Sequence, residues 1–320
     1  MKHANLSIII PFAGCPHQCT FCDQHLITGS STLPSRKEIE EQINICVNRP
    51  NHRSDLAQIA FFGGSFTCIP RERMIALLEI AAPYVEKGFF NGIRISTRPD
   101  GIDSKILRIL KEYHVNSIEL GAQSMDEEVL KLANRGHTPL DTISASNLIH
   151  EMGFSLGLQM LPGLPGDTAK KAYSSAMQLI ALKPQEMRIY PAVIFPGTIL
   201  HEQYKKGLYH PLTVDEALVW TVPIVDEILK SNITLLKVGL HQADGAVAGA
   251  FHPAFGEMVR TGVFNRRIIK ILGNPGPYTL PIHPTELSLA FGQRKSNLDY
   301  WQSQGYTLQF KVDPNAPLYL

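Results

Sequence analysis

The stretch LSIIIPFAGCPHQCTFCD, residues 6–23, joins a short apolar run to three closely spaced cysteines. The run is rich in isoleucine and only a few residues long, which is typical of a buried β-strand. Cys15, Cys19 and Cys22 follow it with the spacing C-x3-C-x2-C. The sequence therefore places three thiols directly after its first strand, and the fold depends on what surrounds that strand.

Five similar apolar runs follow along the chain. Segments with apolar residues at helical spacing lie between them, and several begin at a capping residue such as Ser35 or Asp103 or end at a glycine such as Gly153. This alternation predicts an α/β fold, a partial (β/α)6 TIM-like barrel of parallel strands whose active site lies at their carboxyl ends. The five runs are AQIAFFGG (57–64), GIRIST (92–97), NSIELGA (116–122), FSLGLQML (154–161) and EMRIYPAV (186–193).

The chain changes character near residue 232. Two helices are expected before this point, over residues 195–207 and 213–230. Beyond it, GLHQADGAVAGAFHPAFGEMVR lacks regular periodicity, and the prolines of NPGPYTLPIHP (274–284) indicate a loop. We therefore divide the chain into a core domain, residues 1–231, and a small C-terminal α/β cap or substrate-binding extension, residues 232–320, which ends in a strand near YTLQFKVDP.

The composition is that of an ordinary globular protein. The 320 residues are 44% hydrophobic and 18% charged, and the formal net charge of +1 gives no overall bias towards nucleic acid. The run LSIIIPF is too short to span a bilayer, and no secretory signal precedes it. We therefore expect a cytoplasmic protein with no membrane partner. In that reducing compartment, closely spaced cysteines are more often metal or redox ligands than disulfides.

Two kinds of metal site are compatible with these three thiols. Zinc normally takes four ligands, and only His17, Asp23 and His25 lie near enough in the sequence to complete the set. An iron–sulfur cluster held by three thiolates instead leaves one iron open to another ligand. The spacing favours the cluster, because it follows a strand and not a zinc-ribbon hairpin. The other two cysteines, Cys46 and Cys68, are expected to be core or incidental thiols.

The pattern C-x3-C-x-Φ-C, in which Phe21 is the hydrophobic residue, resembles the hallmark of radical S-adenosylmethionine (SAM) enzymes. The resemblance extends over residues 6 to 210 and is greatest to the radical SAM domain of the Elongator catalytic subunit, with a more distant likeness to oxygen-independent coproporphyrinogen oxidase. Several separated motifs in the right order make chance an unlikely explanation. They are FFGGSFT (61–67), STRPD (96–100), ELGAQSMDEEVLKLANRGHT (119–138), MLPGLPGDT (160–168) and IYPAVIFPGT (189–198).

The resemblance implies a 4Fe-4S cluster on the three cysteines and SAM on the open iron. An electron from the cluster then cleaves SAM to a 5′-deoxyadenosyl radical, and the protein supplies binding, orientation and exclusion of water. Gly63 and Gly64 would let the backbone approach the methionine moiety, and Ser65 could add a hydroxyl. Phe21 belongs to the same cofactor site by its place in the cysteine motif.

Other motifs imply contacts to the rest of SAM. By resemblance, Gln123 and Arg135 would contact the ribose and the carboxylate, and an arginine fork suits a carboxylate. Gln159 matches a ribose-contacting position. Tyr190 and Pro191 follow the sixth strand, where backbone groups edge the adenine.

The sequence departs from its relatives in three places. Ser96 stands where relatives often carry an acidic residue that binds the ribose, and a serine hydroxyl is the weaker partner. We expect no acetyltransferase domain, since the sequence ends where the Elongator subunit continues into one. A second cysteine cluster or a cobalamin-binding segment is not visible, which argues against methylthio transfer and B12-dependent methylation.

The region beyond residue 232 is expected to close over the barrel and to hold the substrate determinants. His241, His252, Glu257 and Arg260 crowd together there among glycines, with Asp244 nearby. Loops with polar residues beside a barrel mouth often contact substrates. Capping, turn chemistry and ordinary surface charge explain the same residues equally well. They are candidates for catalysis on this basis.

The sequence therefore predicts a radical SAM enzyme with an unidentified substrate, and tRNA is the substrate that the resemblance favours. An external electron donor such as flavodoxin or ferredoxin would reduce the cluster. Two alternatives stay open: radical chemistry on a tetrapyrrole or other small metabolite, and a non-catalytic protein that holds a cluster and binds haem or RNA. The presence of Gln123 and Arg135 disfavours the non-catalytic alternative.

Overall fold

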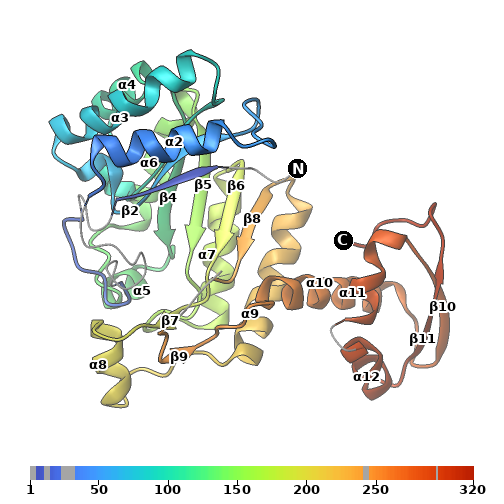
Figure 1. Ribbon diagram of the computed structural model, residues 1–320. Coiled ribbons are helices and arrows are strands. Elements are labelled where there is room, and N and C mark those ends of the chain that lie inside the picture. The colour runs from blue at the N-terminus through green and yellow to red at the C-terminus, as the bar shows by residue number, and fades with distance from the viewer. Residues whose placement is uncertain (1–4, 11–14, 23–32, 241–244, 293–294) are drawn as a thin grey trace.

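A curved sheet of parallel strands forms the centre of the molecule (Figure 1). The computed structural model describes residues 5–10, 15–22, 33–240, 245–292 and 295–320. Its seven-stranded sheet has the order β1-β2-β3-β4-β5-β6-β8, and every neighbouring pair is parallel. The six expected strands are confirmed, and β8 adds a seventh at the edge of this partial TIM barrel. The strands are β1 (Leu6–Ile10), β2 (Gln58–Gly63), β3 (Gly92–Thr97), β4 (Val115–Gln123), β5 (Ser155–Met160), β6 (Glu186–Ile189) and β8 (Thr234–Val238).

Crossover helices pack against this sheet and begin where capping residues predict (Figure 1). At Ser35 the hydroxyl accepts a hydrogen bond from the Glu38 backbone N–H, and the Glu38 carboxylate accepts one from the Ser35 backbone. This reciprocal pair satisfies N–H groups that the first turn leaves free. Asp103 and Asp126 start two further helices through their carboxylates. The helices are α2 (Arg36–Val47), α3 (Arg71–Glu86), α4 (Ser104–Glu112), α5 (Glu127–Leu132), α6 (Pro139–Glu151) and α7 (Ala169–Ala181).

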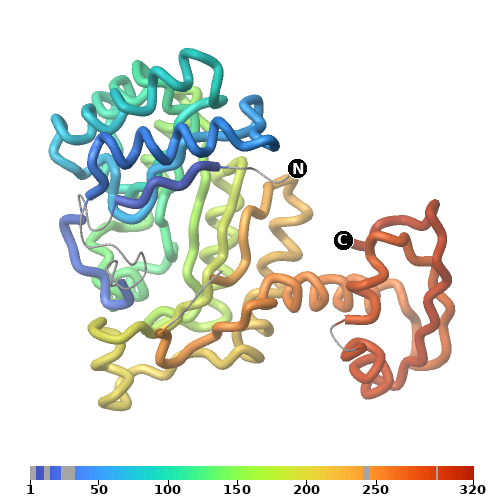
Figure 2. Tube along the Cα trace, in the orientation of Figure 1, coloured from blue at the N-terminus to red at the C-terminus, as the bar shows by residue number. Residues whose placement is uncertain are grey.

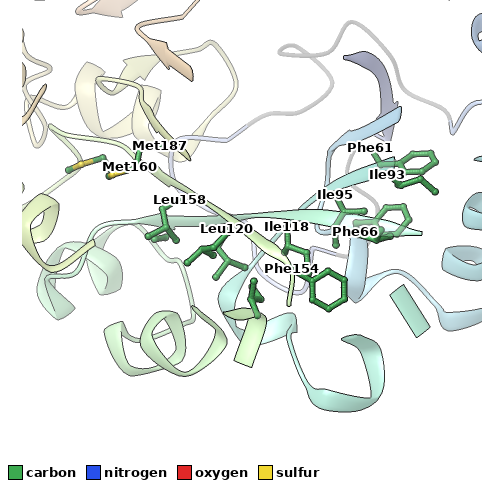
Figure 3. Close-up of a cluster of buried hydrophobic side chains, with 14 of the residues drawn as sticks. Phe61, Phe66, Ile93, Ile95, Ile118, Leu120, Phe154, Leu158, Met160 and Met187 are labelled. Carbon is green, nitrogen blue, oxygen red and sulfur yellow. The ribbon is translucent and has the colours of Figure 1, made fainter. Parts of the chain in front are cut away.

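Alternation along the strands separates an apolar layer from a polar interior. Ile93 and Ile95 of β3 are fully buried in the main hydrophobic core, which strands and helices share. Figure 3 shows these two side chains among those of the neighbouring strands. Arg94 and Ser96 lie between them in the sequence and therefore point to the opposite face of the sheet. That face is the inside of the barrel.

The chain returns to the carboxyl ends of the strands after β6. There β7 (Val193–Ile194) pairs antiparallel with β9 (Ala248–Gly249). Figure 1 shows both strands and α8 at the end of the sheet towards which the arrows point. The two helices expected in this region are confirmed as α8 (Ile199–Lys205) and α9 (Val214–Lys230). In the part of the chain that the structure describes, no helix is long and apolar enough to cross a bilayer.

A second hydrophobic core lies in a C-terminal lobe, which stands apart from the sheet at the end of α10 (Figure 2). The helix α10 (Phe255–Ile271) contributes Phe255, Val259 and Val263 to the main core, and Phe264 and Ile268 to the second one. The lobe is completed by η3 (Pro284–Glu286), α11 (Leu287–Phe291), α12 (Ser296–Ser303) and the parallel strands β10 (Pro277–Ile282) and β11 (Thr307–Val312).

The structure differs from two expectations for this region. The expected boundary at residue 231 falls before β8, which pairs with β6 in the main sheet, so the lobe core begins only within α10. The segment 274–284 was expected to be a loop because of its prolines, yet it contains β10. Pro277 and Pro281 are both exposed on that strand, and among the described residues it pairs with β11 alone. Proline is compatible with a strand at a sheet edge, where its missing N–H interrupts no ladder.

A buried carboxylate joins the sheet's helices to the lobe. Asp226 on α9 is inaccessible to solvent, and its oxygens lie 2.8 Å from Arg267 Nε and 3.1 Å from Lys230 Nζ. Arg267 also donates a hydrogen bond of 2.9 Å to the carbonyl of Tyr319 in the lobe. Burial alone would raise the pKa of Asp226, but the hydrogen bonds from Arg267 and Lys230 hold that pKa below its usual value.

We expect Asp226→Asn to lower the free energy of unfolding by about 2 kcal/mol, because it removes the charged acceptor of the hydrogen bonds from Arg267 and Lys230. The carboxylate stabilises the fold above its ordinary pKa, and this contribution is lost as the pH falls through the lowered pKa. Wild type and variant should therefore converge in acid. Urea denaturation at neutral and acidic pH measures this, with the exposed Asp215→Asn on the same helix as the control. A difference that is constant with pH would contradict the prediction.

Candidate functional site

A cavity of about 800 Å³ opens at the carboxyl ends of the strands. The segments that line it come from the cysteine loop, from the ends of β2, β3 and β4, and from the stretch after β6. The structure thus brings together residues far apart in the sequence. All thirteen residues expected to bind the cluster or SAM line this cavity: Cys15, Cys19, Phe21, Cys22, Gly63, Gly64, Ser65, Ser96, Gln123, Arg135, Gln159, Tyr190 and Pro191.

Backbone hydrogen bonds hold the cysteine loop, residues 15–22, against two neighbouring segments. The Thr20 N–H donates to the carbonyl of Ala133 at 3.0 Å, and the Thr20 carbonyl accepts from Leu200 N–H at 2.7 Å. The Asn134 side-chain amide donates to the carbonyl of Gln18 at 2.7 Å. The three thiols therefore occupy a loop whose backbone position is set by the end of α5 and the start of α8.

Close packing also fixes the loop at Gly136. This glycine has a φ of +73°, which L side chains rarely adopt. A Cβ at this position would lie 2.3 Å from Cδ2 of the His17 ring. The His17 ring therefore packs directly on the backbone of Gly136, and this position has no room for a side chain. His17, considered above as a zinc ligand, has this packing contact.

The glycine motif after β2 makes a similarly close approach. Gly63 has a φ of +114°, and a Cβ there would lie 2.8 Å from the carbonyl oxygen of Ile10. The N–H of Gly64 donates to that same oxygen at 2.8 Å. Ser65 is buried, with its Oγ 3.9 Å from the Sγ of Cys15. A strand end, a glycine turn and the first cysteine thus meet at one edge of the cavity.

Arg135 lies behind the cysteine loop and contacts it directly. Its Nη1 is 3.2 Å from the Sγ of Cys19, and its Nη2 donates to the carbonyl of Gly121 at 2.5 Å. The carbonyl of Arg135 accepts a hydrogen bond from Arg98, which is itself held by Asp100 through two hydrogen bonds of 2.9 Å. The arginine expected to bind the SAM carboxylate is therefore directed at a cysteine sulfur.

His137 adds no positive charge to this group near neutral pH. Burial lowers its pKa to about 4, and the nearby guanidinium groups of Arg135 and Arg98 act in the same direction. Its Nε2 lies 3.2 Å from the carbonyl of Ala122, which requires the proton on that nitrogen. The fixed charges behind the cysteine loop are those of the two arginines and Asp100.

A row of charged side chains crosses the inside of the barrel and was not predicted from the sequence. Glu119 on β4 accepts a hydrogen bond of 2.8 Å from Arg188 Nε on β6, and its other oxygen lies 3.4 Å from Ser96 Oγ. Arg188 also donates to the Tyr190 hydroxyl at 3.2 Å. Deeper in the barrel, Arg94 binds Glu186 and lies 3.7 Å from Glu119.

The signal for this row was present in the strands. In IRI, IEL and MRI a single charged residue interrupts an apolar run, at the positions of Arg94, Glu119 and Arg188. Strand alternation turns each of them to the inside of the barrel. Burial opposes the charge of Arg188, but Glu119 and Tyr190 outweigh it, so the pKa of Arg188 lies above its usual value. Ser96 stands where an acidic residue was expected from the resemblance. The carboxylate of Glu119, on the next strand, lies beside it.

His252, Glu257 and Arg260 do not line the cavity, contrary to expectation. His252 accepts a hydrogen bond of 3.1 Å from the Ala254 N–H, in the turn just before α10. Glu257 and Arg260 lie on α10, which packs against α9 and β8. His241 and Asp244 lie outside the described residues.

The region beyond residue 232 reaches the cavity through a short segment instead. Leu240 lines the cavity together with Val193 and Phe195. These two residues pack with Leu240, Ala246 and Phe251 in a small apolar cluster around the β7–β9 pair. The cavity therefore has an apolar wall formed by Val193, Phe195 and Leu240.

Cys46 and Cys68 are absent from the cavity lining. Cys46 is buried on α2, and this burial raises the pKa of its thiol. Cys68 follows the glycine motif, and burial again raises its pKa, with Asp100 acting in the same direction. Thiols with raised pKa values are poor metal ligands and nucleophiles. The two behave as the structural thiols that the sequence predicts.

Comparison with protein families shows the superfamily to which the chain belongs. The radical SAM superfamily model matches residues 9–176, and a radical SAM C-terminal domain model matches residues 184–263. The chain belongs to the radical SAM superfamily. Members of this superfamily use a 4Fe-4S cluster and SAM. The family match includes the end of β1, the cysteine loop, the glycine motif and β2 to β5.

Relatives extend the comparison beyond the superfamily. An uncharacterized protein of Methanocaldococcus jannaschii is 33% identical over 216 residues, which cover 63% of this chain and 65% of that protein. A tRNA uridine(34) acetyltransferase of Methanocaldococcus infernus is 26% identical over 259 residues, 67% of this chain and 48% of that protein. The chain thus spans about half to two thirds of the length of these relatives.

A solved structure confirms the fold. The archaeal Elp3 of Methanocaldococcus infernus, with an N-terminal deletion, superposes with a TM-score of 0.68 at 20% identity. The match covers 85% of this chain and 64% of that one. At this identity the likeness supports the architecture of the radical SAM core and not a shared reaction.

The cavity fits a cluster and SAM chemically. The three cysteines of the family motif line it beside the glycine turn. Among the described residues, no three His, Cys, Asp or Glu side chains converge on a point that would hold a single metal ion. Thiolates that each bind a different iron of a cluster need no such convergence. Gln123 adds a buried side-chain oxygen with no hydrogen-bond partner, at the cavity wall, where a ligand hydroxyl could donate to it.

We expect alanine at Cys15, Cys19 or Cys22 to abolish the iron–sulfur cluster, because the cysteine motif predicts that each thiolate binds one iron. Cys46→Ala and Cys68→Ala are the matched controls and should keep it, since both thiols lie away from the cavity. Iron content and visible absorbance after anaerobic reconstitution measure the outcome. A cluster that survives without Cys19, or disappears without Cys68, would overturn the ligand assignment.

We expect Gly136→Ala to reduce iron incorporation, since its Cβ would displace the His17 ring and with it the cysteine loop. Gly207→Ala is a matched control, because that glycine has a φ of +68° but no neighbour within 4 Å. Both variants should lose about 1 kcal/mol of stability from backbone strain. Only Gly136→Ala should lose iron, and His17→Ala in the same chain should restore part of it. Equal iron content in the two glycine variants would show that the contact is unimportant.

Proposed function

We propose that this chain binds a 4Fe-4S cluster through Cys15, Cys19 and Cys22 and uses it to cleave SAM in the adjoining cavity. The observation that carries the proposal is the convergence of the cysteine loop, the glycine turn and the polar strand ends on one cavity of about 800 Å³. That volume lies in the range of ligand sites and is large for a single small cofactor. Space for SAM and for part of a substrate is therefore available.

The residues around the glycine turn would bind the methionine end of SAM. The positive φ of Gly63 and the lack of a side chain at Gly64 expose backbone groups beside Cys15. Ser65 lies next to the same cysteine and supplies a hydroxyl. Backbone amides and carbonyls of such a turn bind an amino acid moiety without any flexible side chain, so little entropy is lost on binding.

The nucleoside end of SAM would lie across β4, β5 and the end of β6. The unpartnered oxygen of Gln123 suits a ribose hydroxyl, and Gln159 faces the cavity from the neighbouring strand. Ser96 shares its hydroxyl with Glu119, which supplies the carboxylate that the third strand lacks. Tyr190 and Pro191 follow β6 and border the adenine position.

Bound together, the cluster and SAM supply one-electron reductive cleavage of a carbon–sulfur bond. The chain's own residues would bind, orient and shield the reactants. Phe21 of the cysteine loop packs against two apolar clusters, and Val193, Phe195 and Leu240 form the apolar wall of the cavity. These side chains exclude water from the cavity, which protects reactive species from side reactions.

We propose tRNA as the substrate class and an external flavodoxin or ferredoxin as the reductant. Support for tRNA comes from the relative named tRNA uridine(34) acetyltransferase, which matches 67% of this chain. The C-terminal lobe, with its own core beyond α10, would then bind a distant part of a large substrate as an extension and not as a cap. A small metabolite, by contrast, would bind in the cavity and would not reach the lobe.

We expect the reconstituted, reduced protein to release 5′-deoxyadenosine and methionine from SAM. Gln159→Ala should weaken SAM binding about fivefold, the effect of losing one neutral hydrogen bond of about 1 kcal/mol. Gln178→Ala, exposed on α7, is the control. Equilibrium binding of SAM and product analysis by chromatography measure both effects, and no SAM cleavage under reducing conditions would overturn the enzyme assignment.

Addition of tRNA tests the substrate class separately. Stimulated or substrate-coupled SAM cleavage with unmodified tRNA, together with a mass change in a tRNA nucleoside, is the expected result. Cleavage that responds to no RNA would move the substrate to a small molecule and leave the radical SAM assignment intact.

A further inference from the structure

We propose that Arg135 is a positioning residue for the iron–sulfur cluster, which fixes Cys19 by a hydrogen bond to its sulfur and thereby raises the reduction potential of the cluster. The inference rests on the proposed function, because it takes Cys19 as an iron ligand. Its basis is the distance of 3.2 Å between Arg135 Nη1 and Cys19 Sγ, in a contact where both residues are buried.

The guanidinium of Arg135 is held in this position from several sides. Nη2 donates to the carbonyl of Gly121 at 2.5 Å, and the backbone N–H donates to Leu130 at 3.0 Å. The Arg135 carbonyl accepts a hydrogen bond from Arg98. The residue is 7% exposed, so turning the guanidinium away from Cys19 would break buried hydrogen bonds with little water to replace them.

The charge that faces Cys19 is positive. Arg98 and Asp100 form a forked pair through two hydrogen bonds of 2.9 Å, so their charges cancel in sum. His137 is neutral near neutral pH, as described above. Arg135 therefore contributes an uncancelled positive charge and an N–H donor to the same sulfur.

Both contributions favour the reduced state of a cluster. Reduction adds one electron, and the added negative charge spreads onto the ligand sulfurs. A hydrogen bond to a ligand sulfur and a nearby positive charge stabilise that state more than the oxidised one. The effect is strong in a buried site, where little water screens it. Arg135 should thus make the cluster easier to reduce by a biological donor.

This role differs from the one implied by resemblance, in which Arg135 binds the SAM carboxylate by a fork. Both terminal nitrogens already have partners, Cys19 and Gly121. The remaining donor, Nε, is buried and has no partner. Each terminal nitrogen also carries a second N–H, so three N–H groups are left for a ligand, and a contact with the SAM carboxylate is compatible with the hydrogen bond to Cys19.

The test compares neutral variants of Arg135 in the full chain with its reconstituted cluster and without SAM. Arg135→Gln and Arg135→Met both remove the charge, and Arg108→Gln, exposed on α4, is the control. Redox titration followed by electron paramagnetic resonance gives the midpoint potential, and iron content is measured on the same samples. The expected result is a more negative midpoint potential in whichever neutral variant retains iron, with the control equal to wild type.

Three outcomes would overturn the proposal. An unshifted potential with full iron content would show that the contact does not tune the cluster. Loss of iron in both variants would make the residue an anchor of the loop and not a determinant of potential. A wild-type protein that assembles no cluster would refute the proposed function itself, and the inference with it.

Discussion

Parallel strand direction is the constraint on which the rest of this structure depends. Because all seven strands of the sheet run the same way, the loops that follow them open at one edge. The cysteine loop, the glycine turn and the end of β4 meet there although more than a hundred residues separate the first from the last. The hydrogen bond from the Gly64 N–H to the Ile10 carbonyl shows how closely the ends of β1 and β2 approach each other.

Strand alternation supplies the second half of the site. It turns Arg94, Glu119 and Arg188 into the barrel, where each is largely removed from solvent. Buried ion pairs rarely stabilise a fold more than apolar residues of similar size would. Their presence here is better explained by the polar wall that they give to the cavity. The fold stays stable although these ion pairs contribute little, because the main apolar core lies on the other face of the same strands.

The sequence allowed the strands, the helix starts and the cavity residues to be predicted, because each depends on a local pattern: apolar runs, capping side chains and motif spacing. It did not reveal the charged row, since a single charge such as Glu119 in an apolar run looks like a minor irregularity until alternation is applied. The sequence also did not reveal where His252 and Glu257 lie in the fold. Whether a helix packs on the mouth or on the flank of a barrel depends on tertiary contacts, and the glycine-rich stretch before α10 has no periodicity to indicate them. The contact of Arg135 with Cys19 depends in the same way on how the loop folds back.

The helix α10 belongs to both hydrophobic cores, and this has a mechanical meaning. It has 17 residues, so it is a rod of about 26 Å. Neither core can rotate about the other without bending it, and bending breaks backbone hydrogen bonds along its length. Its first turn begins a few residues after β9, which pairs with β7 beside the cavity. A displacement of the lobe is therefore transmitted along α10 to the β7–β9 pair at the rim of the cavity. The shape of that rim thus depends on what the lobe binds.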